Sequence, residues 1–157
     1  MKIHLWSVGK PHDLYVKEGV ADFTRRISKY FPVEWTIIPA AKSSSTFANA
    51  DLIRKEGKVI LGALRKEDCL IALDQSGKQF SSPLLATMLQ SKANASTKNL
   101  IFLIGGAFGL DNIVLQRAEI RWSLSSLTFP HQLVRLILVE QIYRACTIGR
   151  NEKYHHD

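Results

Sequence analysis

Short apolar runs alternate along this chain with longer segments that have the periodicity of helices. Five apolar runs predict strands, at residues 2–8, 33–38, 69–74, 100–104 and 119–124. The longer segments predict five helices, at residues 13–28, 51–64, 81 onward, 111–118 and 130–148. Such alternation predicts an α/β fold, in which an open, mostly parallel sheet carries helices on both faces. Because the chain shows no internal repeat or linker, residues 1–157 are expected to form a single domain.

Three segments are expected to meet at one edge of this sheet, because each of them follows directly after a strand. They are residues 73–77, 105–110 and 124–130. In open α/β sheets, ligands bind beyond the carboxyl ends of the strands. Within the first segment and just after it, the polar run 75–78 is expected to turn the chain. The pattern therefore predicts a ligand pocket before any chemistry is assigned to it.

The second of these segments is rich in glycine and reads Gly-Gly-Ala-Phe-Gly at residues 105–109. Such a loop can hold a phosphate at the start of a helix, and its bare backbone also allows close approach to a flat adenosine group. Its spacing does not match the dinucleotide motif GxGxxG, and it lacks the Lys-Ser/Thr pair of a P-loop. A tight turn between strand and helix, without any ligand, is the alternative interpretation at this point.

The last predicted helix, at residues 130–148, is apolar around most of its circumference. Such a helix needs cover on several sides. Because a domain of this size is expected to cover only one side, a second subunit is predicted to cover the rest. Glu140 and Arg144 stand four residues apart, in the order that favours an ion pair within the helix. In a buried setting the same pair could orient the arginine toward a substrate anion.

The C-terminal tail places one aromatic residue among basic ones. Its members are Arg150, Lys153, Tyr154, His155 and His156. An aromatic ring among cations suits stacking on a nucleobase while phosphates are held nearby. A frayed and solvated tail is the alternative.

Composition excludes several classes of protein. With 46% hydrophobic residues the chain is too apolar to be intrinsically disordered. No apolar run approaches the roughly 20 residues of a membrane-spanning helix, and the first residues lack the apolar segment of a secretory leader. Cys69 and Cys146 lie far apart in apolar runs, so both are expected to be buried thiols in a reducing cytosol. A cytoplasmic protein, with no membrane partner, is therefore expected.

Charge and histidine spacing narrow the chemistry further. The 21 basic residues exceed the 14 acidic ones, which gives a formal net charge of +7. Such a surplus favours a polyanionic partner, although many ordinary proteins share it. The histidines are dispersed or merely adjacent, so no metal site is expected. Because the nucleophile-elbow motif GxSxG is also absent, a serine hydrolase is disfavoured.

Several sequence motifs, taken in their order along the chain, point to a particular protein family, which composition alone does not. They are Leu-Asp-Gln-Ser-Gly-Lys at 73–78, Ile-Gly-Gly-Ala-Phe-Gly-Leu at 104–110, Ser-Leu-Ser-Ser-Leu-Thr-Phe-Pro-His-Gln-Leu-Val-Arg at 123–135, Glu-Gln-Ile-Tyr-Arg-Ala at 140–145, and the final Tyr154-His155. With these motifs the whole chain resembles the RlmH family of SPOUT methyltransferases. The resemblance implies a homodimer with a C-terminal trefoil knot. It also implies S-adenosylmethionine-dependent methylation of N3 of a pseudouridine, in a hairpin of large-subunit ribosomal RNA at the position usually numbered 1915. The expected substrate is this RNA in the assembled ribosome.

The same resemblance implies roles for particular residues. The implied cofactor contacts are Leu73, Gly105, Leu124, Ser125, Ser126, Leu127, Thr128 and Phe129. Arg144, Tyr154 and His155 match the positions that the family uses for catalysis and substrate binding. The tail departs from the family pattern, because Lys153 stands where a proline is usual and His156 where a lysine or arginine is usual.

Two other classes of function are considered beside this one. A non-catalytic ribosome-binding factor of the same fold would bind RNA without transferring a methyl group. A nicotinamide-dependent dehydrogenase is disfavoured, because the glycine motif fails and no acidic residue stands at the expected distance after it.

Overall fold

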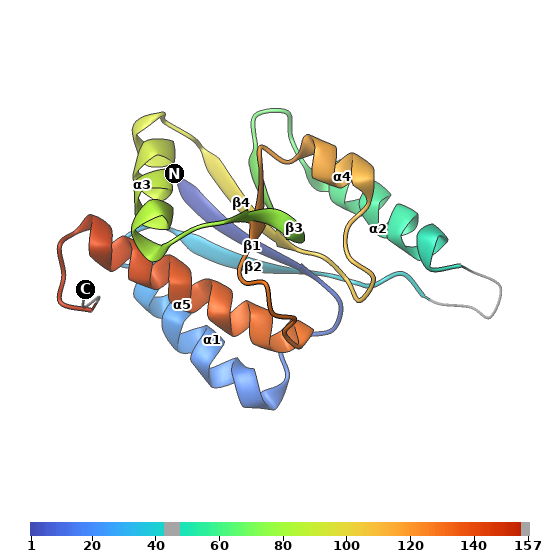
Figure 1. The fold of residues 1–157 in the computed structure, drawn as a ribbon, viewed down its shortest axis with the longest axis horizontal. Coiled ribbons are helices and arrows are strands. Elements are labelled where there is room, and N and C mark those ends of the chain that lie inside the picture. Colours follow the sequence, from blue (N-terminus) through green and yellow to red (C-terminus); the bar gives the residue numbers. More distant parts are fainter. Residues whose placement is uncertain (43–47, 155–157) are drawn as a thin grey trace.

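The computed structural model describes residues 1–42 and 48–154 and contains five strands and five helices in this part of the chain (Figure 1). The strands are β1 Lys2–Val8, β2 Val33–Ile38, β3 Cys69–Gln79, β4 Asn99–Ile104 and β5 Ile120–Ser123. The helices are α1 Leu14–Ile27, α2 Asn49–Ala63, α3 Ser82–Asn94, α4 Asn112–Arg117 and α5 His131–Gly149. The predicted alternation is confirmed, and every predicted boundary except the end of β3 lies within two residues of the observed one.

The strands form one sheet in the order β2-β1-β4-β3-β5, and every neighbouring pair is parallel. The predicted sheet, expected to be mostly parallel, is thus wholly parallel among the described strands. β4 lies between β1 and β3, and its residues Leu100–Ile104 are all buried. This explains its unbroken apolar run, because a parallel strand covered on both faces needs apolar side chains in both directions.

Helices cover both faces of the sheet, as predicted (Figure 1). On one face, Leu5 and Phe102 belong to a core that also includes buried residues of α1, α3 and α5. On the other face, Trp6 and Leu103 pack with Ile60 of α2 and with α4. Successive strand residues point to opposite faces, so the two cores are separated by the sheet itself. No helix in the described part of the chain is long and apolar enough to cross a membrane.

The turn predicted at residues 75–78 is wrong, because β3 continues through these residues to Gln79. β3 first pairs with β5 as far as Leu73 opposite Trp122, and pairing resumes after a register shift with Lys78 opposite Trp122. Gly77 makes the resumed pairing possible, since a Cβ there would lie 2.6 Å from the backbone carbonyl carbon and oxygen of Arg121. Gln-Ser-Gly-Lys has the composition of a turn, but pairing with a distant strand overrides this local preference.

Cover for α5 comes largely from the same chain, which corrects the expectation that one domain covers only one side of this helix. α5 packs against both α1 and α3 (Figure 1), and its residues Leu138, Val139 and Ile142 are fully buried. A stripe on another side of the helix is only half-buried in the single chain. Its members are Leu133, Ile137, Glu140 and Arg144.

The close approach at Gly77 predicts opposite effects for two glycine-to-alanine substitutions. Gly77→Ala should lower the free energy of unfolding by about 1–3 kcal/mol, because the new methyl group pushes β5 away from β3. Gly62→Ala should raise it by about 0.5 kcal/mol, because a Cβ on this residue of α2 has nothing within 4 Å and alanine favours a helix. Urea unfolding of the two variants measures both values. Equal effects of the two substitutions would contradict the tight β3–β5 contact.

Candidate functional site

The carboxyl ends of β4 and β5 and the middle of β3 surround a cavity of about 620 Å³. Its lining comes from these parts of the strands, the loops after β4 and β5 and the start of α5. The lining residues are Leu73, Asp74, Gln75, Ile104, Gly105, Gly106, Ala107, Phe108, Gly109, Leu110, Trp122, Ser123, Leu124, Ser125, Leu127, Thr128, Phe129, His131 and Val134. The three segments predicted to converge at the sheet edge do converge here.

Parallel pairing explains why these segments meet. Leu73 of β3 pairs with Ile104 at the end of β4 on one side and with Trp122 near the end of β5 on the other, so β4 and β5 end beside Leu73 while β3 continues to Gln79. The β3 extension is linked to the loop after β5 by a side-chain contact, in which the Gln75 amide donates to the Thr128 hydroxyl at 2.9 Å. Asp74 accepts hydrogen bonds from the Arg121 guanidinium, which connects the β3 extension to β5.

The loop after β5, residues 124–130, is shaped by its own serines. The Ser123 hydroxyl donates to the backbone carbonyl of Ser125 at 2.9 Å. The Ser125 hydroxyl in turn accepts from the backbone N–H of Leu127 at 3.0 Å. These bonds leave the Leu127 side chain 68% exposed at the cavity, an unusual position for a leucine. Ser126 is exposed and does not belong to the cavity lining, unlike the other seven predicted cofactor contacts.

The glycine-rich loop after β4 forms a tight turn and also lines the cavity. Gly109 has a φ of +86°, which favours glycine, and its N–H donates to the carbonyl of Gly106 at 3.1 Å. A Cβ on Gly105 would lie 2.9 Å from the Leu110 side chain and 3.0 Å from the carbonyl of Gly109. The loop thus brings bare backbone to the cavity wall, which suits a flat ligand. The tight turn is thus observed, and the same backbone is exposed to a ligand at the cavity wall.

His131, the first residue of α5, joins that helix to the glycine loop. Its Nε2 lies 2.5 Å from the carbonyl oxygen of Gly105. Burial lowers the pKa of His131, and the nearby Arg135 guanidinium lowers it further, while the Gly105 carbonyl opposes this shift. The imidazole is therefore neutral near pH 7, with Nε2–H as the donor to Gly105. Only the fold reveals this contact, because residues 105 and 131 are far apart in the sequence.

Arg135 lies behind the cavity as a fully buried cation. Its Nε donates to the Ser7 hydroxyl at 3.0 Å, and its Nη1 donates to Nδ1 of His12 at 3.2 Å. Among the described residues its Nη2 has no hydrogen-bond partner. Burial lowers the pKa of His12, and the Arg135 charge adds to this effect. Arg135 thus connects α5 to the end of β1 and to the loop after it.

Two of the three predicted catalytic residues lie together, but away from the cavity. Arg144 Nη2 contacts the Glu140 carboxylate at 2.6 Å, so the predicted ion pair is confirmed. Tyr154 donates to the same carboxylate oxygen at 3.1 Å, and the Arg144 guanidinium lies 4.8 Å from the centre of its ring. Burial and Glu140 raise the pKa of Tyr154, so its hydroxyl stays protonated. Neither residue lines the cavity, and His155 lies outside the described residues.

The distance to the cavity follows from the length of α5. At about 1.5 Å per residue, the helix rises by about 20 Å between His131 and Arg144. One chain therefore presents the cavity and the Arg144–Tyr154 pair at opposite ends of the same helix.

The cysteines and possible metal ligands are the remaining candidates for chemistry. Both cysteines are free and buried, as predicted, and burial raises the pKa of Cys69 to about 11 and that of Cys146 to about 12. No group of three or more His, Cys, Asp or Glu side chains in residues 1–42 and 48–154 could hold a metal ion.

Comparison with known proteins shows which family the chain matches. The family model described as "Predicted SPOUT methyltransferase" matches residues 1–155. Proteins named "Ribosomal RNA large subunit methyltransferase H" are similar over the full length of the chain. The one from Cytophaga hutchinsonii is 46% identical over 99% of this chain and 100% of its own. Those from Parabacteroides distasonis and Flavobacterium johnsoniae are each 41% identical, over 100% and 99% of both chains, respectively.

The environment of His12 and His131 predicts a loss of stability in mild acid. Because both pKa values are lowered in the folded protein, the unfolded chain binds more protons once the pH falls below about 6.5. The free energy of unfolding should therefore be fully retained above this pH and decrease below it. His131→Gln keeps a donor for Gly105 but cannot titrate, so the decrease should be smaller in this variant. Urea unfolding at about pH 5.5 and about pH 7.5 tests this. The same pH dependence in wild type and variant would contradict a neutral His131.

Proposed function

Because this chain belongs to the SPOUT methyltransferase family and is a methyltransferase, we propose that it methylates N3 of a pseudouridine in large-subunit ribosomal RNA, at the position usually numbered 1915, with S-adenosylmethionine as donor. The observation that carries the proposal is the cavity at the strand ends, which the three predicted segments line. The names of the similar proteins support the RNA substrate. The expected setting is the assembled ribosome in the cytoplasm.

The cavity has the properties that a bent nucleoside cofactor requires. Its volume of about 620 Å³ lies within the range of small-molecule pockets. Its walls combine bare backbone at Gly105 with the side chains of Leu73, Leu124, Leu127 and Phe129. We assign these residues, with Ser125 and Thr128, to binding the cofactor. Ser126, which is exposed beside them, remains part of this assignment through its backbone.

When bound, the cofactor supplies a methyl group that is already activated on a sulfonium, so the protein needs to align the base and remove a proton. The proton at N3 of the pseudouridine leaves before or during attack on the methyl carbon. Tyr154 and His155 position the base and assist removal of this proton. Arg144 stabilises the negative charge that develops on the uracil ring. In the single chain Glu140 holds both Arg144 and Tyr154, which orients them together.

The separation of these groups from the cavity supports a homodimer. Two chains that pair their α5 helices in antiparallel orientation would bring the Arg144 end of one helix to the His131 end of the other. The half-buried stripe of Leu133, Ile137, Glu140 and Arg144 offers a surface for this pairing, because its members recur every three or four residues. We therefore propose that each active site combines the cavity of one subunit with the tail of its partner. The C-terminal trefoil knot is part of the proposal and is supported by the family assignment.

Three substitutions test the proposed catalytic residues. Arg144→Ala, Tyr154→Phe and His155→Ala should each reduce turnover by about 10²-fold or more at saturating cofactor, because positioning and charge stabilisation contribute about that much. The measurement is methyl transfer to ribosomes from a strain that lacks the gene, with the methylated pseudouridine identified by mass spectrometry. Lys58→Ala, an exposed change on α2, is the control and should retain wild-type turnover. Near wild-type rates for all three variants would contradict the assignment.

Ribosome binding, methyl transfer and calorimetry together distinguish the proposed function from the two rival classes. A non-catalytic ribosome-binding factor would bind these ribosomes without producing the methylated base. A dehydrogenase would bind NAD in calorimetry and not S-adenosylhomocysteine, whereas the proposed function requires the reverse.

Mixed dimers test whether the active site is shared between subunits. Gly105→Val should inactivate the cavity, since even a Cβ there would lie 2.9 Å from the Leu110 side chain. Arg144→Ala should remove the contribution of the C-terminal part of the chain to the active site. Refolding the two inactive variants together should restore about a quarter of wild-type activity, because half of the dimers are then mixed and each has one intact site. Absence of any recovery, with mixed dimers verified by mass, would contradict the shared site.

A further inference from the structure

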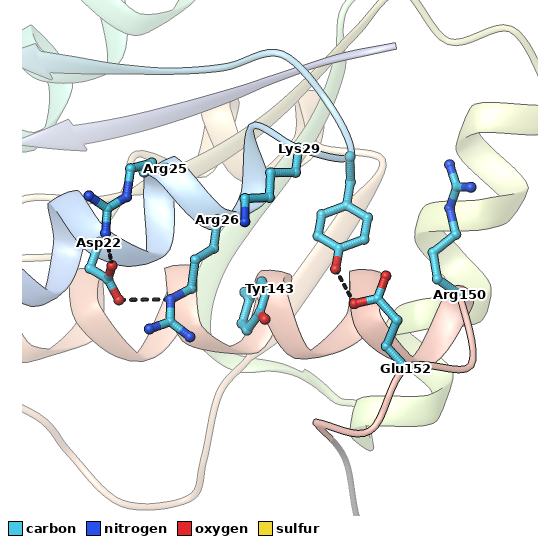
Figure 2. A pocket seen from close by; sticks show the side chains of 8 residues that line it. Asp22, Arg25, Arg26, Lys29, Tyr143, Arg150 and Glu152 are labelled. Carbon is cyan, nitrogen blue, oxygen red and sulfur yellow. Dashed lines mark hydrogen bonds and ion pairs between the residues drawn. The ribbon is translucent and has the colours of Figure 1, made fainter.

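A second cavity, of about 740 Å³ and shown in Figure 2, has its α5 residues near the C-terminal end of that helix, whereas the proposed cofactor site lies at its start. It is formed by the C-terminal part of α1 and the residues just after it, by α5 and by the residues that follow α5. Its lining residues are Asp22, Arg25, Arg26, Lys29, Tyr30, Tyr143, Arg150 and Glu152. We call this cavity the basic groove. None of its residues belongs to the candidate active site described above.

The basic groove carries a surplus of positive charge. Four cationic side chains face two carboxylates there. Asp22 contacts both Arg25, at 2.5 Å, and Arg26, at 2.8 Å, so one carboxylate holds two guanidinium groups in place (Figure 2).

The other carboxylate, Glu152, accepts a hydrogen bond from the Tyr30 hydroxyl at 2.5 Å. Within residues 1–42 and 48–154, neither Lys29 nor Arg150 forms an ion pair, and both side chains are exposed. In the view of Figure 2, Lys29 and Arg150 lie on either side of Glu152. These two cations are therefore available to an external anion.

Aromatic rings connect the basic groove to the proposed catalytic tail. The Arg26 guanidinium lies 5.6 Å from the centre of the Tyr143 ring. The Tyr143 ring in turn contacts Tyr154 edge-on, with 4.7 Å between the ring centres. A strand bound along the groove would therefore run past Tyr143 to Tyr154, where the target base is expected.

We propose that the basic groove binds the phosphate backbone of the substrate RNA beside the target nucleotide. This inference rests on the proposed function and extends it to the RNA-binding surface. Lys29 and Arg150 contact phosphates directly, and Asp22 holds Arg25 and Arg26 in the orientation that a second phosphate requires. The combination of cations with adjoining aromatic faces matches single-stranded RNA, whose phosphates and unstacked bases need both kinds of contact.

The test is the double variant Lys29→Ala/Arg150→Ala of the full chain. Its dissociation constant for ribosomes from a strain lacking the gene should rise about tenfold at moderate salt. The slope of log K against log salt should become shallower by about 1.5, because two phosphate contacts are lost. Affinity for S-adenosylhomocysteine should stay at the wild-type value, since neither residue lines the other cavity.

Two control variants test whether the loss of affinity comes from the positive charges at positions 29 and 150. Lys58→Ala/Lys66→Ala removes the same formal charge from exposed positions outside the groove and should leave affinity and salt slope within twofold of wild type. Lys29→Arg/Arg150→Lys keeps both charges and should restore most of the lost affinity.

Three outcomes would overturn the groove proposal. Unchanged ribosome affinity and salt slope in the double variant would show that the groove does not contact phosphate. Dissociation of the dimer in sedimentation would assign the groove to the subunit interface. Normal affinity for deproteinised large-subunit RNA, with loss only on ribosomes, would assign it to a ribosomal protein. Failure of the proposed function is a separate result, seen when wild-type protein binds ribosomes but transfers no methyl group.

Discussion

Parallel pairing of β3 with both β4 and β5 is the constraint on which the candidate active site depends. It places the ends of β4 and β5 beside residues 73–75 of β3, so the loops after β4 and β5 and this part of β3 face the same cavity. The loops need little regular structure of their own. The Gln75 amide joins the β3 extension to the loop after β5 through Thr128, and the two bonds made by Ser123 and Ser125 shape that loop internally.

α5 connects the cavity to β1 near one end of the helix and contacts the C-terminal tail near the other. At its start, His131 binds the carbonyl of Gly105, and one turn later Arg135 binds Ser7 and His12. Toward its other end, Glu140 accepts hydrogen bonds from Arg144 and Tyr154. Because a helix is rigid over this length, the two ends cannot approach each other within one chain. In the proposed homodimer, the second subunit is therefore required by the distance between the assigned functional groups rather than by a lack of cover for α5.

Much of the fold was predictable from local patterns, and so was most of the cavity. The apolar runs of β3 and β4 identify strands covered on both faces, and the order of the elements predicts which segments meet at one edge. The extension of β3 was not predictable in this way, because residues 75–78 prefer a turn in isolation. Pairing with β5 keeps them in the sheet, and the bare backbone of Gly77 leaves room for the close approach of Arg121 that this pairing requires.

The alternation of strands and helices, the three convergent segments and the resemblance to a methyltransferase family follow from the amino-acid sequence, since all of these depend on local periodicity or on ordered motifs. The partners of His131 and Arg135, the cover of α5 by α1 and α3, and the basic groove between α1 and the tail emerge only when the chain folds. The physical reason is that these features join residues that are distant along the chain. A hydrogen bond between residues 105 and 131, or a groove between residues 25 and 150, leaves no periodic trace in either segment.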